Sequence, residues 1–250
     1  MLIMVLKSIS RYMFEDKYLT KKDHAKNALS NSASALIQLI PFIGGALNQI
    51  SFGYMASLQM SRIENYLVDL SSFIKNEAIQ KDTLSKMNQY FSSSDGIEYL
   101  YMNLDKVSKT RNSEKLKLYR NMLINQSKDD DILDLDISEE YLNILEVLRV
   151  ESILVLEFIS KYKSKVSNRN NIELGSLDAN LTVDDSNYLD KLKSKYNFDS
   201  DTCEYYHQQL ISNGLIVDDG MGRVGTRPLE MFRITKMGGE FLEYVGGLKK

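Results

Sequence analysis

The sequence predicts a mainly helical fold, in which an N-terminal helical bundle precedes a smaller C-terminal domain that combines helices with a β-hairpin. Long stretches carry apolar residues at helical spacing with charged residues between them, as amphipathic helices do. Only 2 prolines interrupt the 250 residues, which favours long helices. The clearest signal for strands lies near residue 215, where a short apolar run precedes a glycine-rich segment.

The composition is that of a globular protein, since 43% of the residues are hydrophobic and 26% are charged. The formal net charge of −3 gives no overall attraction to phosphate, so contact with nucleic acid or lipid needs a local basic patch. Cys203 is the single cysteine, which excludes an intramolecular disulfide and fits a reducing compartment. The apolar start of the chain is too short for a signal-peptide core, so we expect a cytoplasmic protein.

The N-terminal part begins with a short basic, amphipathic helix within residues 1–26 and continues with a stretch, residues 27–61, that has no charged side chain. A proline and a pair of glycines are expected to break this stretch into a hairpin of two helices, over about 28–40 and 46–61. The residues at its centre are Leu36, Leu39, Ile40, Pro41, Phe42, Gly44, Gly45 and Leu47.

Two interpretations of the hairpin at residues 27–61 are open. A helix that is apolar all round belongs in a core, so the hairpin can form the centre of the bundle. Alternatively, the hairpin meets a bilayer, beside a basic helix that rests on anionic lipid. Neither helix reaches the roughly 20 residues needed to cross a bilayer, and Gln38, Asn48 and Gln49 raise the cost of insertion. We favour the core and keep membrane association through residues 27–61 as the alternative.

Charged amphipathic helices follow the hairpin. Ile63, Leu67, Leu70 and Ile74 recur at helical spacing, and further helices are expected over about 80–92, 97–108 and 112–126. A turn is expected at Asp95-Gly96, and Asn112-Ser113 followed by Glu114 predicts a cap for the last of these helices.

The charged run at residues 128–131 is interpreted as a solvated hinge. It divides the chain into a helical domain, residues 1–130, and a second domain, residues 131–250. In the second domain we expect helices over about 138–148, 151–163, 185–196 and 199–213.

The end of the chain has the most specific pattern. A helix closes on Gly214, a short apolar strand follows, and residues 218–228 form a loop. A second strand then leads into a last helix capped by Thr235. This order, with Gly214-Leu-Ile216 and Ile234-Thr235 before the last helix, resembles the end of winged-helix domains. The resemblance implies a C-terminal winged-helix (α+β) domain but no particular function, because the fold serves many roles.

DNA binding by such a domain depends on the charge of its recognition helix. The candidate, residues 199–213, contains Asp199, Asp201 and Glu204 and has no Lys or Arg. Arg223, Arg227 and Arg233 of the wing and its strand are the candidates for nucleic-acid contact. DNA binding is therefore disfavoured, and a protein partner or a second copy of the chain is expected.

No catalytic, metal-binding or cofactor-binding constellation is recognisable in the sequence. Cys203 and His207 lie one helical turn apart, but nothing completes a nucleophilic or metal site, so a partly buried cysteine is favoured. The aspartates near residue 130 lack the glycine and glutamate of a calcium loop. Gly44-Gly45 lies in no phosphate-binding motif.

Residues 40–49 and 62–70 resemble a group of uncharacterised bacterial proteins in which an apolar "IPxxGG" hairpin leads into a charged helix. These proteins are often associated with mobile elements and phage defence, which is the setting that the resemblance implies. We expect a non-enzymatic adaptor or regulatory protein that acts through protein–protein contacts, without a cofactor. The alternatives are a membrane-acting effector that exposes residues 27–61, and a winged-helix DNA-binding regulator.

Overall fold

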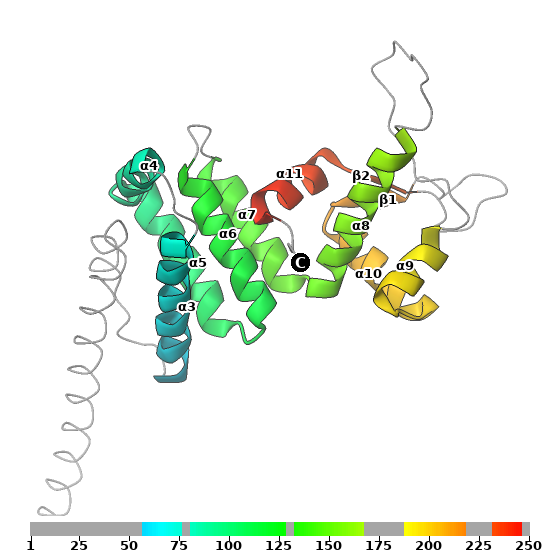
Figure 1. Cartoon of the computed structure of the whole chain (residues 1–250), viewed down its shortest axis with the longest axis horizontal. Helices are drawn as coiled ribbons and strands as arrows, with labels where there is room; N and C mark the ends of the chain where they lie inside the picture. Colours follow the sequence, from blue (N-terminus) through cyan, green and yellow to red (C-terminus); the bar gives the residue numbers. More distant parts are fainter. Residues whose placement is uncertain (1–56, 77–80, 129–132, 168–187, 219–231, 247–250) are drawn as a thin grey trace, which may run out of the picture. The chain divides into compact units, whose positions relative to one another are not determined.

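The computed structural model describes residues 57–76, 81–128, 133–167, 188–218 and 232–246, which are mainly helical (Figure 1). Within these ranges there are nine helices and one two-stranded sheet. The helices are α3 (Ser57–Asn76), α4 (Lys81–Phe91), α5 (Ser94–Lys109), α6 (Ser113–Lys128), α7 (Leu135–Val147), α8 (Val150–Ser167), α9 (Tyr188–Tyr196), α10 (Ser200–Ser212) and α11 (Lys236–Val245). The strands are β1 (Ile216–Asp218) and β2 (Phe232–Ile234). Each helix predicted between residues 80 and 213 has a counterpart here.

The chain forms two compact units, Met1–Tyr101 and Met102–Lys250. The first contains α3, α4 and the start of α5, and the second contains the remaining described elements. This division differs from the predicted domains, 1–130 and 131–250. Helix α6 precedes residue 130, yet it packs on α11 near the end of the chain. The charged run at residues 128–131 therefore lies between two helices of the same unit.

Helix α3 of the first unit is amphipathic, with Ile63, Leu67 and Leu70 fully buried on one side. It starts at Ser57 and continues through residue 61, so the predicted end of a hairpin helix at that position is wrong. No proline or glycine lies within α3, and nothing in its sequence stops the helix there. The predicted hairpin residues Leu36, Leu39, Ile40, Pro41, Phe42, Gly44, Gly45 and Leu47 lie outside the described residues.

The predicted turn at Asp95-Gly96 is instead the first turn of α5. The structure needs a small residue at Gly96, because a Cβ there would lie 2.0 Å from the carbonyl oxygen of Tyr90 at the end of α4. The glycine thus allows close packing of two consecutive helices. The predicted cap of α6 is confirmed: the Asn112 side-chain oxygen accepts hydrogen bonds from the backbone N–H groups of Glu114 and Lys115, at 2.9 and 3.2 Å.

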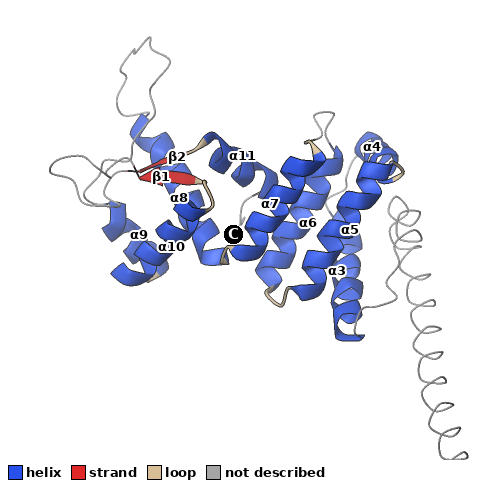
Figure 2. Ribbon diagram, turned by 180° about the vertical axis from the view of Figure 1, so that it is seen from behind, coloured by secondary structure: helices blue, strands red, loops and turns tan. Residues whose placement is uncertain are grey.

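Helix α8 is the centre of the second unit. Ile153, Val155, Leu156, Phe158 and Ile159 are all buried, so the helix is covered on nearly every side. It packs against α10, α11 and β2, and in Figure 2 it lies among these elements. Apolar residues on most sides of its first half explain why its sequence has little amphipathic character.

The small sheet follows α10 directly. Gly214 follows the end of α10 and lies in the left-handed region at φ +69°. The N–H of Gly214 donates to the carbonyl of Ile211, and the N–H of Leu215 donates to the carbonyl of Leu210. Strands β1 and β2 then pair antiparallel, with Ile216 opposite Ile234. The Thr235 hydroxyl accepts from the N–H of Gly238 at 2.9 Å, so the predicted cap of the last helix is confirmed.

Helix α11 docks on α6 through polar contacts at its C-terminal end. Asn121 of α6 donates to the carbonyl of Val245 at 3.0 Å, and Asn125 donates to that of Tyr244 at 2.7 Å. The Tyr244 hydroxyl donates to the side-chain oxygen of Gln126 at 2.8 Å. The amides of Asn121 and Asn125 satisfy carbonyls that a helix end leaves without partners, and thereby hold the end of α11 on α6.

The two neighbouring glycines of α11 provide a matched pair of substitutions. A Cβ at Gly238 would lie 2.0 Å from the carbonyl oxygen of Leu215, whereas a Cβ at Gly239 meets nothing within 4 Å. We expect Gly238→Ala to lower the free energy of unfolding by about 2 kcal/mol or more, because the backbone of Leu215 must move. Gly239→Ala should raise it by up to about 1 kcal/mol through helix propensity. Urea unfolding followed by circular dichroism measures both, and equal effects would contradict the close packing.

Candidate functional site

The exposed side of α10, which we call the α10 face, is formed by Asp201, Glu204, Tyr205, Gln208 and Ser212. The opposite side of the helix, with Cys203, Tyr206 and Leu210, is buried in the unit. The α10 face contains the two carboxylates of the helix, Asp201 and Glu204, and α10 has no Lys or Arg. Its charge is that of a surface that repels phosphate and attracts cationic groups.

Tyr205 is the large hydrophobic residue of the α10 face, with 45% of its surface exposed. The Arg149 guanidinium carbon lies 5.5 Å from the centre of its ring. The side-chain N–H of Gln209 donates to the Tyr205 hydroxyl at 2.8 Å, and the Gln209 oxygen accepts from the Ser152 hydroxyl at 2.6 Å. The ring is therefore held in place although it is exposed, so its ordering costs little when a partner binds.

Sequence reasoning missed Arg149, which follows α7 and lies at the edge of the α10 face. Its contact with Tyr205 joins residues far apart in the chain, and nothing in the sequence marks them as a pair. Of the arginines predicted to contact nucleic acid, Arg233 lies in β2 opposite Val217 and is half-buried. Arg223 and Arg227 lie outside the described residues.

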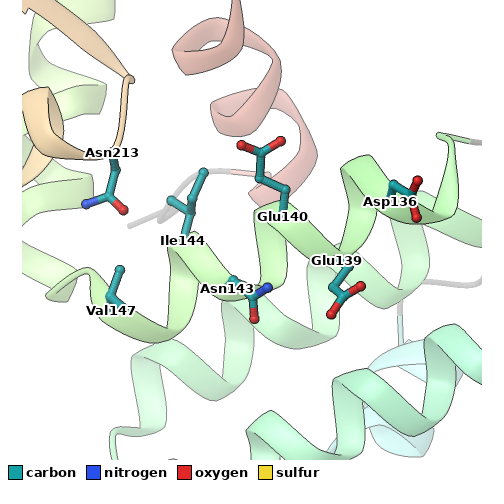
Figure 3. Close-up of a pocket in the computed structure, with 7 residues that line it drawn as sticks. All are labelled: Asp136, Glu139, Glu140, Asn143, Ile144, Val147 and Asn213. Atoms are coloured by element: carbon teal, nitrogen blue, oxygen red, sulfur yellow. The ribbon is translucent and has the colours of Figure 1, made fainter.

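An open hollow of about 440 Å³ lies along α7, next to the C-terminal end of α10 (Figure 3). Its lining residues are Asp136, Glu139, Glu140, Asn143, Ile144 and Val147 of α7, with Asn213 after α10. Lys106 of α5 donates to the side chains of Asn143 at 2.7 Å and Glu146 at 2.5 Å. It thereby neutralises the charge of Glu146 near the C-terminal end of α7. The surface nearer the start of α7 is acidic.

Cys203 and His207 are both buried, with exposed fractions of 1% and 0%, so the predicted burial of the cysteine is confirmed. Nδ1 of His207 lies 2.6 Å from the carbonyl oxygen of Cys203, its own helical neighbour. Since a carbonyl only accepts, Nδ1 carries the proton, and Nε2 accepts from the Tyr188 hydroxyl at 3.2 Å. Both imidazole nitrogens are thus used in packing, and the thiol is not one of their partners.

The environment keeps these groups uncharged. Burial lowers the pKa of His207 below its ordinary value, against the opposing effects of the Cys203 carbonyl and Asp218. Burial likewise raises the pKa of the Cys203 thiol and raises that of Tyr188 well above its ordinary value. A protonated thiol is a weak nucleophile, so this cluster has the properties of a hydrogen-bonded core.

The part of the chain that the structure describes includes no group of three or more His, Cys, Asp and Glu side chains arranged to hold a metal ion. None of the helices in this part combines the length and the apolar character needed to cross a membrane. Most of the predicted hairpin, up to residue 56, lies outside this part.

Comparison of the chain with protein-family models, with curated proteins and with solved structures finds no match.

The buried imidazole predicts a pH dependence of stability. Because the pKa of His207 is lower in the folded than in the unfolded chain, where it is about 6.5, the unfolded state takes up the proton first as pH falls. The contribution of His207 to the free energy of unfolding is fully present above about pH 6.5 and is lost as the pH falls toward the folded pKa. The loss is at most about 1.4 kcal/mol for each pH unit.

Urea unfolding at pH values from about 7.5 to 5.5 measures this effect. The fall in unfolding free energy should be shallower in His207→Gln than in the unchanged protein. His24→Gln, which removes the other histidine, is the control and should keep the steeper fall. Identical pH profiles for all three proteins would show that His207 titrates alike in both states.

Proposed function

We propose that the chain is a non-enzymatic adaptor or regulatory protein, and that α8 to α11 with β1 and β2 form a winged-helix module that binds a protein partner. The order of three helices, a strand, a second strand and a last helix supports the module. The observation that carries the binding proposal is the α10 face, where an exposed, fixed aromatic ring lies among carboxylates. Tyrosine and arginine are the residue types that most often dominate protein interfaces.

The charge of the α10 face argues against the alternative of DNA readout. In the winged-helix arrangement, α10 is the helix that would enter the major groove, and there Asp201 and Glu204 would approach phosphates. Arg149 is the cation that contacts this face, and it is stacked on Tyr205. One arginine beside two carboxylates suits a protein surface, where oppositely charged side chains can alternate.

The resemblance of residues 40–49 to bacterial proteins associated with phage defence makes that process the first setting in which to test the adaptor. The α10 face belongs to the second unit and the resemblance to the first. A protein with this division would bind its partner through the second unit and use the first for another contact.

The purified full chain should bind no DNA duplex with a Kd below ~10 µM at physiological salt, because the carboxylates of α10 repel phosphate. Fluorescence anisotropy with labelled duplexes of random and palindromic sequence measures this. A nanomolar, sequence-selective complex that is lost in the double variant Arg223→Ala, Arg227→Ala would contradict the proposal and support the DNA-binding alternative.

Site-specific photocrosslinking in cells tests the α10 face directly. A photoreactive phenylalanine analogue at position 205 should form a discrete adduct with another protein. The same analogue at position 101 is the matched control, since Tyr101 is 48% exposed and Tyr205 45%. Removing the ring anchor should weaken binding by about 2 kcal/mol, so Arg149→Ala should reduce the adduct at 205 severalfold. Equal adducts at both positions, or none at 205, would argue against this face.

A further inference from the structure

The hydrogen bonds of His207 join two helices, α9 and α10. Its Nδ1–H donates to the carbonyl of Cys203, one turn earlier in α10, and its Nε2 accepts from the Tyr188 hydroxyl of α9. Tyr188 is the first residue of α9, and the centre of its ring lies 4.8 Å from that of Phe232 in β2. The bond from Tyr188 to His207 is buried, so it is an internal link that holds the start of α9 on α10.

Helix α9 has little buried surface with which to hold its place. It lies beside α10 in both views of the ribbon (Figures 1 and 2). Of its nine residues, Tyr188 and Leu192 are the buried ones. At the surface, Lys193 donates to the Ser200 hydroxyl of α10 at 2.8 Å. A short helix with so few buried side chains belongs to the part of a unit that opens most easily.

The surroundings of the imidazole are mostly uncharged. Asp218, at the end of β1, favours the protonated ring, but burial outweighs this effect and keeps the pKa of His207 below its ordinary value. The uncharged groups that face the imidazole or its partner come from four elements: Tyr188 of α9, Cys203 of α10, Phe232 of β2 and Phe158 of α8. Of the charges on these elements, Lys193 of α9 forms its bond at the surface, and Glu157 of α8 pairs with Lys161.

Protonation of His207 changes its hydrogen bonding as well as its charge. A protonated imidazole donates from both nitrogens, so Nε2 can no longer accept the bond from the Tyr188 hydroxyl. The new charge is buried, and burial of a charge is costly unless water or an opposite charge reaches it. Separation of α9 from α10 admits water to the imidazole, while α10 and β2 keep their packing on α8.

We propose that His207 and Tyr188 form a pH-sensitive switch, in which proton uptake by the imidazole releases α9 from α10 and exposes the Cys203 thiol while the rest of the unit stays folded. Histidine is the side chain that titrates in the range where such switches operate. The thiol is 1% exposed in the closed state and is close enough to Tyr188 and Lys193 of α9 for their charges to influence one another. The switch lies on the buried side of α10, so it does not depend on the partner proposed for the α10 face.

Cys203 is the single cysteine of the chain, so its reactivity measures the opening directly. Dithiodipyridine reacts with exposed thiols and releases a thione whose absorbance is followed. The ratio of the rates for urea-unfolded and native protein at one pH defines the protection of Cys203, and it cancels the pH dependence of the thiol itself. We expect this protection to be constant above about pH 6.5 and to fall toward about pH 5.5. The fall is at most about tenfold for each pH unit, because opening takes up one proton.

Substitutions of the two bonded residues test the switch. His207→Gln removes the group that takes up the proton, so the protection of Cys203 should become independent of pH, whereas His24→Gln should keep the pH dependence. Tyr188→Phe keeps the ring and removes the hydroxyl, so protection should fall severalfold at about pH 7.5, where one buried bond is lost. This variant preserves the packing and decides the question even where His207→Gln does not fold. A pH dependence that persists in His207→Gln, or unchanged protection in Tyr188→Phe, would refute the switch.

A second buried thiol distinguishes the release of α9 from unfolding of the whole unit. Ser138 of α7 is 0% exposed and its hydroxyl has no hydrogen-bond partner among the described residues, so Ser138→Cys in a Cys203→Ala background is a conservative probe. At about pH 5.5 the thiol at 138 should be protected at least about tenfold more than the thiol at 203, because opening of α9 reaches only the latter. Equal protection at the two positions, or protection of Cys203 that does not change with pH, would overturn the proposal.

Discussion

The second unit depends on the docking of its last helix. Helix α11 contacts β2, α8 and α6, so it joins the sheet to a helix, α6, that precedes it by more than a hundred residues. Gly238 permits the close approach to Leu215, and the side-chain amides of Asn121 and Asn125 receive the final carbonyls. Buried carbonyls without partners would be costly, so these amides are a condition for placing a helix end at this position.

This docking also determines the candidate surface. With α11 in place, α8 is enclosed, and the first turn of α8 is held against α10 by the bond from Ser152 to Gln209. The guanidinium of Arg149 then lies over Tyr205. The exposed ring is thus held by contacts that lead to the core, so its orientation does not depend on a partner.

Local signals predicted the elements, because they act within a few residues of the chain. Asn112, Gly214 and Thr235 terminate helices through bonds to their immediate neighbours, and a single sequence contains all the information for such bonds. The unit boundary and the pairing of Arg149 with Tyr205 depend on contacts between distant segments. The charged run at 128–131 indicates solvation, and solvated segments occur within a unit as well as between units.

Charge alone is a weak basis for affinity on surfaces as exposed as these. Each solvent-exposed ion pair contributes roughly 0–1 kcal/mol to binding and is weakened by salt. The carboxylates on α7 and α10 therefore contribute more to specificity than to affinity. A fixed aromatic ring contributes apolar area and a hydroxyl at little entropic cost. The α10 face combines both features at Tyr205, whereas the hollow along α7 has only the exposed Val147 beside its carboxylates. This difference in apolar content is why a lasting complex is expected at the α10 face and not at the hollow along α7.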